Sequence, residues 1–303
     1  MKKRWLILIL LAVLLCAALI ARVIWKGGFV QRVEATAATN AVDAKLNLPY
    51  WDNPAADGKH QLDLYLPRGA TGEPLVTIFH GGAWARGDRT MRPIVEIARW
   101  FAARGVAAAA VSYRLAPEFK PEAQADDAAH ATLWLANHAA EYGYDPRKIF
   151  LLGHSAGSHL AALIACDRTY LDALGAPPTL PAGVVALAPA IDMRPTDEKI
   201  SPVIRQMIHN VFGDDPAYRT KLSPAVYAHA GCPPFLFVVG SGDHLVPVPP
   251  VERFAASLRA AGTSATMITV RGRGHIDLFH DMVSPGDRSG EAALAFIRES
   301  VGR

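Results

Sequence analysis

The 303-residue sequence predicts an α/β fold with a mainly parallel central sheet covered by helices on both faces. Short runs such as residues 75–79 are apolar at consecutive positions, which indicates strands buried on both faces. These runs alternate along the chain with longer stretches of helical periodicity. Hydrophobic residues make up 51% of the chain and charged residues 19%, which excludes a disordered protein.

The first 26 residues form a basic and strongly apolar leader. Residues 5–21 are 17 positions without a charge, and as a helix they would be about 25 Å long, near the lower limit for crossing a bilayer. Because Lys2, Lys3 and Arg4 precede the run, we expect an uncleaved membrane anchor with the rest of the chain outside the cytoplasm. A cleaved signal peptide, followed by secretion, is the main alternative, and a lipoprotein attached through Cys16 is a weaker one.

The leader also explains the net charge of +3. Five of the 31 Lys and Arg residues lie in residues 1–26 with no Asp or Glu, so the rest of the chain carries 26 basic and 28 acidic residues, a formal charge of −2. Such a body lacks the basic surface that grips phosphates, and we expect no nucleic-acid partner. It contains only Cys166 and Cys232, which could pair in an oxidising compartment, although two separate buried thiols are the expected arrangement.

Residues 27–60 are rich in Ala and Thr and contain turn-forming pairs, so we expect them to be a tether. Residues 61–303 are expected to form one catalytic domain. Its first strand, 62–66, alternates and ends at a proline, which is typical of an edge strand. Continuous apolar runs predict the remaining strands at 75–79, 106–112, 149–152, 184–188, 235–239 and 266–270. Helical periodicity predicts helices over 94–104, 122–142, 156–166, 249–261 and 289–301.

The stretch 192–229 breaks this alternation. It has scattered apolar residues, several prolines and an acidic turn at 213–216. We expect a cap-like insertion that covers a site at the ends of the strands.

The string Gly153-His154-Ser155-Ala156-Gly157 lies between a predicted strand and a predicted helix. A G-x-S-x-G string alone occurs by chance, but this strand–turn–helix context is specific for a nucleophilic serine raised above the sheet. The flanking glycines avoid clashes at the sharp turn. Ser155 is therefore the candidate nucleophile.

A second glycine-containing string, His80-Gly81-Gly82-Ala83-Trp84, follows the predicted strand 75–79. Backbone N–H groups in such a loop can stabilise the oxyanion that forms during acyl transfer. We expect the N–H groups of Gly82, Ala83 and Ala156 to form this oxyanion hole.

The base and the acid of a triad are expected at two further strand ends. Asp243 follows the strand 235–239, and His275 follows the strand 266–270. The chain order of serine, acid and histidine is typical of α/β-hydrolases. Alternatives remain: His280 for the base, and Asp192 or Asp277 for the acid.

Trp84 and His154 lie within the two glycine-containing strings and are candidate substrate-binding residues, although packing in the core would explain Trp84 equally well. His80 precedes the glycine turn and is expected to shape the loop. We see no metal-ligand spacing, phosphate loop or dinucleotide fingerprint, so no metal and no cofactor is expected.

Three motifs make the chain resemble the esterase/lipase group of α/β-hydrolases that includes hormone-sensitive-lipase-like enzymes. They are HGGAW at 80–84, GHSAG at 153–157 and YRLAPE at 113–118. The resemblance runs from about residue 60 to the C-terminus and implies carboxylic ester hydrolysis with Ser155, Asp243 and His275 as the triad.

The chain also departs from that group. Ala83 replaces the usual glycine, His154 replaces the common aspartate, and the N-terminal cap is missing. HGGAW with GHSAG is more similar to small, open members, namely acetylxylan or feruloyl esterases and arylformamidase-like (kynurenine formamidase) enzymes.

The resulting hypothesis is a membrane-anchored serine carboxylesterase that acts outside the cytoplasm on short-chain acyl or aryl esters. Its expected partners are a small-molecule ester substrate and the membrane. An arylformamidase, which would cut an amide bond with the same triad, is the first alternative. A catalytically silent hydrolase fold used for binding is the second. The oligomeric state and the acyl length are not predicted, because loops shape such pockets.

Overall fold

The computed structural model describes residues 41–53, 58–69, 71–195 and 200–302, so the leader 1–26 lies outside the described residues. Among those that it describes, no helix is long and apolar enough to cross a membrane. The chain divides into two units, Met1–Ala41 and Val42–Arg303. The second unit holds the fold and the site.

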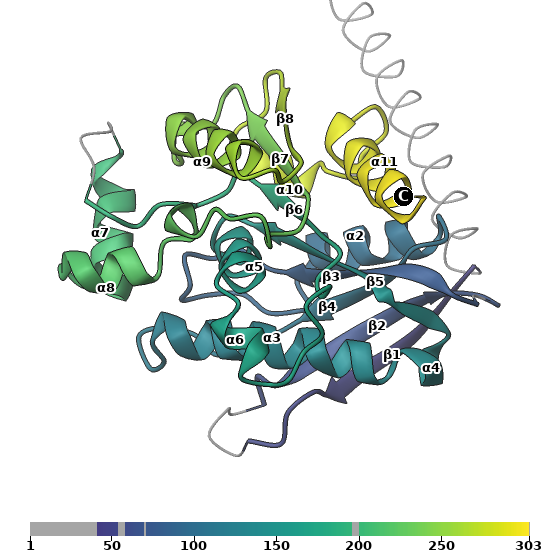
Figure 1. Ribbon diagram of the computed structural model, residues 1–303. Helices are drawn as coiled ribbons and strands as arrows, with labels where there is room; N and C mark the ends of the chain where they lie inside the picture. Colours follow the sequence, from purple (N-terminus) through teal and green to yellow (C-terminus); the bar gives the residue numbers. More distant parts are fainter. Residues whose placement is uncertain (1–40, 54–57, 70, 196–199, 303) are drawn as a thin grey trace, which may run out of the picture. The chain divides into compact units, whose positions relative to one another are not determined.

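One sheet of eight strands forms the centre of this second unit, with the order β1-β2-β4-β3-β5-β6-β7-β8 (Figure 1). The strands are β1 (Val42–Pro49), β2 (Gln61–Pro67), β3 (Glu73–Phe79), β4 (Ala107–Val111), β5 (Tyr144–His154), β6 (Gly183–Leu187), β7 (Phe235–Gly240) and β8 (Ala265–Val270). β1 pairs with β2 and β2 with β4 in the antiparallel sense, while all the other pairs are parallel. The predicted mainly parallel sheet is therefore confirmed.

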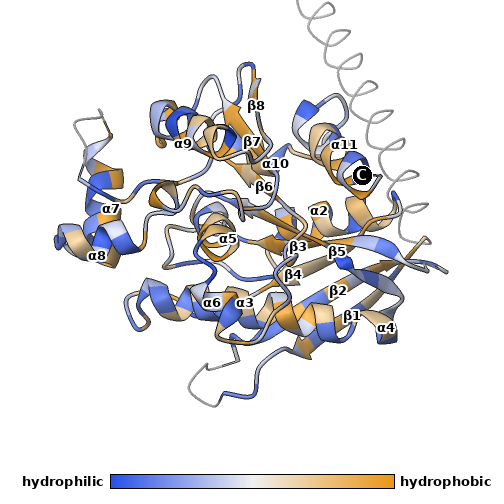
Figure 2. Cartoon of the chain, in the orientation of Figure 1, coloured by the Kyte–Doolittle hydropathy of each residue, from blue (hydrophilic) through white to orange (hydrophobic). Residues whose placement is uncertain are grey.

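Both faces of the sheet are apolar, because neighbouring residues in a strand point to opposite sides. In β5, Ile149 and Leu151 belong to one core cluster, and Phe150 and Leu152 belong to the other. Figure 2 shows the central strands as predominantly hydrophobic. The first cluster is covered by α3 (Pro121–Asn137), α5 (Ala156–Cys166) and α9 (Val248–Ala260). The second is covered by α2 (Arg92–Ala102) and α11 (Arg288–Val301).

The predicted tether is wrong from residue 42 onward, since residues 42–49 form β1. Val42 is the only buried residue of this strand, although apolar residues alternate along it at 42, 44, 46 and 48, a pattern that is typical of a strand. β1 pairs along β2, which also pairs with β4. The strand predicted at 62–66 is therefore not an edge strand.

The helix predicted over 122–142 is divided at His138 into α3 and α4 (Ala139–Tyr142). His138 leaves the helical dihedral angles, with φ −102° and ψ 8°, and its ring is hydrogen-bonded to the carbonyl of Trp134. α4 then ends at Gly143, which has a φ of 83° that suits glycine.

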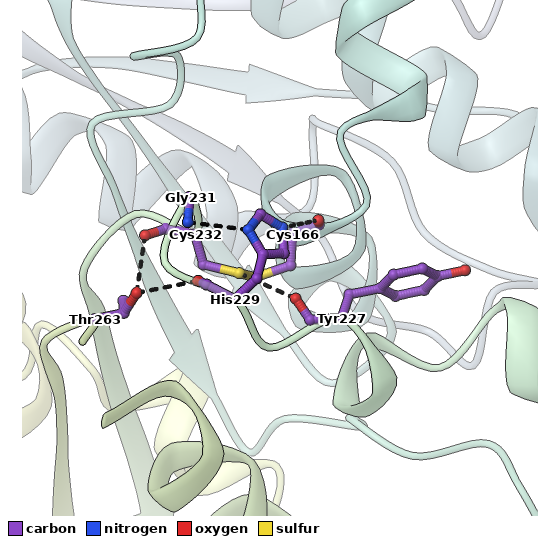
Figure 3. Close-up of a disulfide and its surroundings, with 6 residues drawn as sticks. All are labelled: Cys166, Tyr227, His229, Gly231, Cys232 and Thr263. Carbon is purple, nitrogen blue, oxygen red and sulfur yellow. Dashed lines mark hydrogen bonds between the residues drawn. A yellow bond between two sulfur atoms is a disulfide. The ribbon is translucent and has the colours of Figure 1, made fainter. Parts of the chain in front are cut away.

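Cys166 and Cys232 form a disulfide (Figure 3), so the expectation of two separate thiols is wrong. α5 starts after the C-terminal end of β5. Its last residue, Cys166, lies beside the loop that precedes β7, which contains Cys232. The two Cα atoms are 5.0 Å apart. Around the bridge, the hydroxyl of Thr263 donates to the carbonyls of His229 and Cys232. The ring of His229 is hydrogen-bonded to the carbonyl of Cys166. The residues are 66 positions apart, so only the topology brings them together.

Candidate active site

Ser155 lies at the turn between β5 and α5, as expected. Its backbone has φ 53° and ψ −115°, a conformation that is strained for a residue with a side chain. The turn is possible because the chain is tightly packed around it: a Cβ atom on Gly157 would lie 2.1 Å from the carbonyl oxygen of Phe79. The start of α5 therefore contacts the end of β3 directly, and only glycine fits there.

The structure brings Ser155, His275 and Asp243 into one hydrogen-bonded line. His275 Nε2 lies 2.9 Å from Ser155 Oγ, and His275 Nδ1 lies 2.8 Å from Asp243 Oδ2. Since a carboxylate only accepts, Nδ1–H donates to Asp243, and Nε2 of the neutral ring accepts from the serine hydroxyl. This is the tautomer that a general base needs.

Asp243 is held by the loop that follows β7. Its Oδ1 accepts hydrogen bonds from the backbone N–H groups of Leu245 (2.8 Å) and Val246 (3.1 Å). Burial by itself would raise the pKa of Asp243, but the hydrogen bond and charge of His275, together with these two N–H groups, lower it overall. Asp243 is thus ionised and oriented towards the imidazole at neutral pH.

The alternative base and acids are placed elsewhere. Asp192 is paired with Arg194, with Asp192 Oδ2 2.6 Å from Arg194 Nη2. Asp277 accepts from the backbone N–H of Gly274 at 3.0 Å. His280 is exposed at the end of α10 (Asp277–His280). None of these three side chains contacts the hydroxyl of Ser155 or the ring of His275.

Gly82 and Ala83 line the same cavity as Ser155, and Ala156 is the residue that follows Ser155 in the chain. Gly82 and Ala83 both have positive φ, 128° and 52°, so this loop turns sharply beside the end of β3. Among the described residues, none accepts a hydrogen bond from the backbone N–H of Gly82 or Ala83. Ala156 is the first residue of α5, and its N–H has no partner within the helix. Among the residues that the structure describes, no backbone carbonyl accepts a hydrogen bond from any of these three N–H groups.

The YRLAPE segment and α3 hold this loop in place. The hydroxyl of Tyr113 donates to the carbonyl of His80 at 2.7 Å, and the rings of these residues stack 4.1 Å apart. The carbonyl of Trp84 accepts from the Gln124 side chain and from the backbone N–H of Ala116, both at 2.9 Å. Burial lowers the pKa of His80 to about 4, so its ring remains neutral and shapes the loop. Sequence reasoning did not identify Gln124, which is 40 positions from Trp84.

Trp84 and His154 both line the same cavity as Ser155. Trp84 is 4% exposed, and its Nε1–H donates to His159 Nδ1 at 3.1 Å. His154 Nε2 lies 2.9 Å from the carbonyl oxygen of His275. Burial, followed by the charge of His275, lowers the pKa of His154 to about 3. A neutral His154 therefore steadies the loop that carries His275.

The cavity has a volume of about 910 Å³. Its walls come from residues 82–86 after β3, which we call the oxyanion loop, from the loops after β6, β7 and β8, and from the insertion. Within the described part of residues 192–229, the chain forms α7 (Pro202–Phe212), α8 (Pro216–Lys221) and the short 3-10 helix η2 (Pro224–Val226). Residues 202–209 of α7 all line the cavity, so this helix is one of its walls.

The insertion is attached to the body at specific points. Nε2–H of His159, in α5, donates to the carbonyl of Leu222 at 2.7 Å. The hydroxyl of Tyr218 lies 2.5 Å from a carboxylate oxygen of Glu122 in α3. His159 therefore contacts both the insertion and Trp84 of the oxyanion loop, a link that no sequence motif marks.

The described residues contain no group of three or more His, Cys, Asp or Glu side chains that could hold a metal ion.

The chain is similar to a known family and to proteins that are named esterases. The model of the BD-FAE family matches residues 62–258. A probable isoprenylcysteine alpha-carbonyl methylesterase of Arabidopsis thaliana is 27% identical over 77% of this chain and 51% of its own length. Esterase LipC of Mycobacterium tuberculosis is 30% identical over 73% of this chain and 56% of its own length. The chain thus spans about half the length of these curated relatives.

Solved structures agree on the fold. A truncated carbohydrate esterase from gut microbiota superimposes with a TM-score of 0.74 at 21% identity, covering 86% of this chain and 97% of that one. Esterase 2 of Thermogutta terrifontis gives a TM-score of 0.65 at 25% identity, covering 86% and 94%. The fold is that of the α/β-hydrolases.

Proposed function

The chain belongs to the BD-FAE family, and from this premise we propose that it is a serine carboxylesterase that hydrolyses short-chain acyl or aryl esters. The observation that carries the proposal is the hydrogen-bonded line of Ser155, His275 and Asp243 at the wall of a large cavity. The family match, the curated relatives named esterases and the α/β-hydrolase fold support it.

The first half-reaction acylates Ser155. His275 Nε2 takes the hydroxyl proton as Ser155 Oγ attacks the ester carbonyl. The negative charge then develops on the carbonyl oxygen, where the N–H groups of Gly82, Ala83 and Ala156 stabilise it. His275 returns its proton to the alcohol oxygen, the carbon–oxygen bond breaks, and the alcohol leaves.

Water completes the second half-reaction. His275 deprotonates a water molecule that attacks the acyl-enzyme, and the acid leaves when Ser155 recovers its proton. In both halves the imidazole becomes cationic for a moment. The ionised Asp243, 2.8 Å from Nδ1, stabilises that cation, and neutral His154 adds no opposing charge beside it.

Ser155→Ala tests the proposal directly. With the full chain in detergent and an aryl acetate as substrate, we expect kcat to fall on the order of 10⁶-fold while the circular dichroism spectrum stays unchanged. A fluorophosphonate should label the wild type and leave the variant unlabelled. Substantial activity in Ser155→Ala would refute the assignment of the nucleophile.

Two further results would point away from an esterase. Cleavage of an N-formyl aryl amide far faster than of the matched ester would identify an arylformamidase. Absence of both turnover and fluorophosphonate labelling in the wild type would identify a binding protein.

We also propose that residues 1–26 anchor the protein in a membrane, with the catalytic domain (42–303) outside the cytoplasm. The apolar leader supports the anchor. The Cys166–Cys232 disulfide supports an oxidising compartment, because such bonds are rare in the cytosol. A full-length mass in the membrane fraction is expected, and a shortened mass in the soluble fraction would contradict the anchor.

A further inference from the structure

The apolar stripe of α7 is larger than folding requires. Ile204, Met207, Ile208 and Val211 follow the i, i+3, i+4, i+7 spacing that places side chains on one face of a helix. Ile208 and Val211 pack against the core of the domain. Ile204 and Met207 are not among the described side chains that pack against the core, yet both line the cavity.

Apolar side chains that line the cavity also lie beside the proposed base and acid. Ile276 follows His275 directly, lines the cavity and is 52% exposed. Leu245 and Val246 donate their N–H groups to Asp243, and they too line the cavity. The side on which His275 would protonate the leaving alcohol is therefore apolar.

Charged groups in the cavity wall are largely neutralised by one another. Asp192 pairs with Arg194, and Asp214 pairs with Arg219 and His209. Two lining arginines, Arg86 and Arg205, have no ionic partner among the described residues, but both are exposed and can stay hydrated. Among its described lining residues, the cavity therefore offers apolar surface to a ligand and no buried, unpaired charge.

A cavity of about 910 Å³ lies at the upper end of the range that holds drug-sized ligands. A simple acetate ester would fill only a small part of it. The unfilled part would leave Ile204, Met207 and Ile276 in water, although burying each such side chain is favourable.

From these observations we propose that the site takes esters of a bulky, apolar alcohol, with the alcohol group held between α7 and the loops after β7 and β8. The inference rests on the proposed esterase function and deepens it: the acyl group is short, and the alcohol supplies the apolar bulk. Binding of the alcohol group would be driven by the burial of Ile204, Met207 and Ile276 against it.

Two matched ester series test the proposal. One keeps acetate and lengthens a primary alcohol from ethyl to octyl, and the other keeps ethanol and lengthens the acid from acetate to octanoate. Because primary alcohols have similar leaving-group reactivity, kcat/KM in the first series reports binding of the alcohol. We expect kcat/KM to rise at least about tenfold along the alcohol series and to stay level or fall along the acid series. A rise confined to the acid series would overturn the proposal.

Variants of α7 identify the surface responsible. Ile204→Ala and Met207→Ala should each lower the ratio of kcat/KM for octyl acetate to kcat/KM for ethyl acetate about tenfold. Neither side chain packs against the core, so folding should be retained. Asn210→Ala is the matched control, because Asn210 lies on the same helix outside the cavity lining. Equal alcohol dependence in all three variants and the wild type would refute the role of α7.

The outcomes separate this inference from the function on which it rests. If Ser155-dependent hydrolysis of ethyl acetate occurs without any dependence on alcohol size, the esterase proposal stands and the inference about the alcohol fails. If no ester is hydrolysed, the esterase proposal itself fails.

Discussion

Ser155 owes its position to neighbouring residues that have no side chain. Gly153 and Gly157 let α5 start against the ends of β5 and β3, and a Cβ atom on Gly153 would lie 2.3 Å from the backbone of Gly157. The strained φ of 53° at Ser155 is therefore imposed by packing on both sides. Substitutions at the residues next to Ser155 should therefore lower both the activity and the stability.

Gly157→Ala is the direct test. The new Cβ would lie 2.1 Å from the carbonyl oxygen of Phe79, so the start of α5 must move. We expect the free energy of unfolding to fall by about 1–3 kcal/mol and kcat to fall at least about tenfold, measured by urea denaturation and ester hydrolysis.

Gly302→Ala serves as the control for that substitution, because its Cβ would meet nothing closer than 3.8 Å. Wild-type stability and kcat in both variants would show that the elbow does not depend on a glycine at 157.

Among the elements, α5 connects the nucleophile to the rest of the site. His159 lies one turn after Ser155, and its two ring nitrogens bind Trp84 of the oxyanion loop and the Leu222 carbonyl of the insertion. Phe212 of α7 packs edge-on against both rings, with centroids 4.9 Å from Trp84 and 5.6 Å from His159. The oxyanion loop and the insertion are thus fixed by the same helix.

His159→Phe keeps an aromatic ring but removes both hydrogen bonds. Because Trp84 Nε1–H and the Leu222 carbonyl would lose their partner, we expect a loss of about 1–3 kcal/mol in stability. We also expect kcat to fall about tenfold, with a smaller change in KM, since the oxyanion loop would be less well positioned.

His159→Gln is the conservative counterpart, because an amide can accept from Trp84 and donate to Leu222. It should recover most of the kcat that His159→Phe loses. Identical kcat values for the Phe and Gln variants would mean that packing, and not these hydrogen bonds, sets the loop.

The elements that could be predicted from the sequence are those that a local pattern of residues marks. The buried strands β3 to β7, the turns that follow them and the order of Ser155, Asp243 and His275 are all visible as apolar runs ending in polar motifs. β1 was missed although apolar residues alternate at 42, 44, 46 and 48, because the Ala- and Thr-rich residues before it favoured a tether. Its place beside β2 depends on pairing with a distant strand, which a local pattern does not encode. The contacts of Gln124 and His159 with Trp84 join residues 40 and 75 positions apart, which no local pattern encodes.

In the molecule as a whole, the Cys166–Cys232 disulfide is a covalent link that was not predicted from the sequence. It closes a loop of 66 residues, and the chain-entropy model gives such a crosslink about 4 kcal/mol of stabilisation. A Cys166→Ser/Cys232→Ser variant should therefore unfold at a clearly lower urea concentration than the oxidised wild type. Its midpoint should match that of the reduced wild type. Coincident curves for the oxidised and reduced wild type would contradict a structural role.

Three buried imidazoles make the stability of the fold depend on pH. Burial lowers the pKa values of His80, His154 and His159 to about 4, 3 and 4. In the unfolded chain an imidazole has a pKa near 6.5, so below that pH the unfolded state binds protons that the folded state does not. Their contribution is fully present above about pH 7.5 and is lost progressively down to about pH 4.

We therefore expect the free energy of unfolding to fall between pH 7.5 and 5.5 by about 1 kcal/mol for each of these rings. Urea denaturation at the two pH values measures the difference. His159→Gln lacks one of the three imidazoles and should reduce the loss by about a third. A free energy of unfolding that does not change over this range would show that the rings are protonated in the folded state.

The position of the disulfide along the chain has a consequence for a nicked molecule. Ser155 precedes Cys166, whereas Asp243 and His275 follow Cys232, and the described helices of the insertion lie between the two cysteines. A single protease cut anywhere in that interval would give two fragments, one with Ser155 and the other with Asp243 and His275. They would migrate as one species without reductant and as two with it. The triad would then be shared by two polypeptides joined covalently, as in an enzyme matured by internal cleavage.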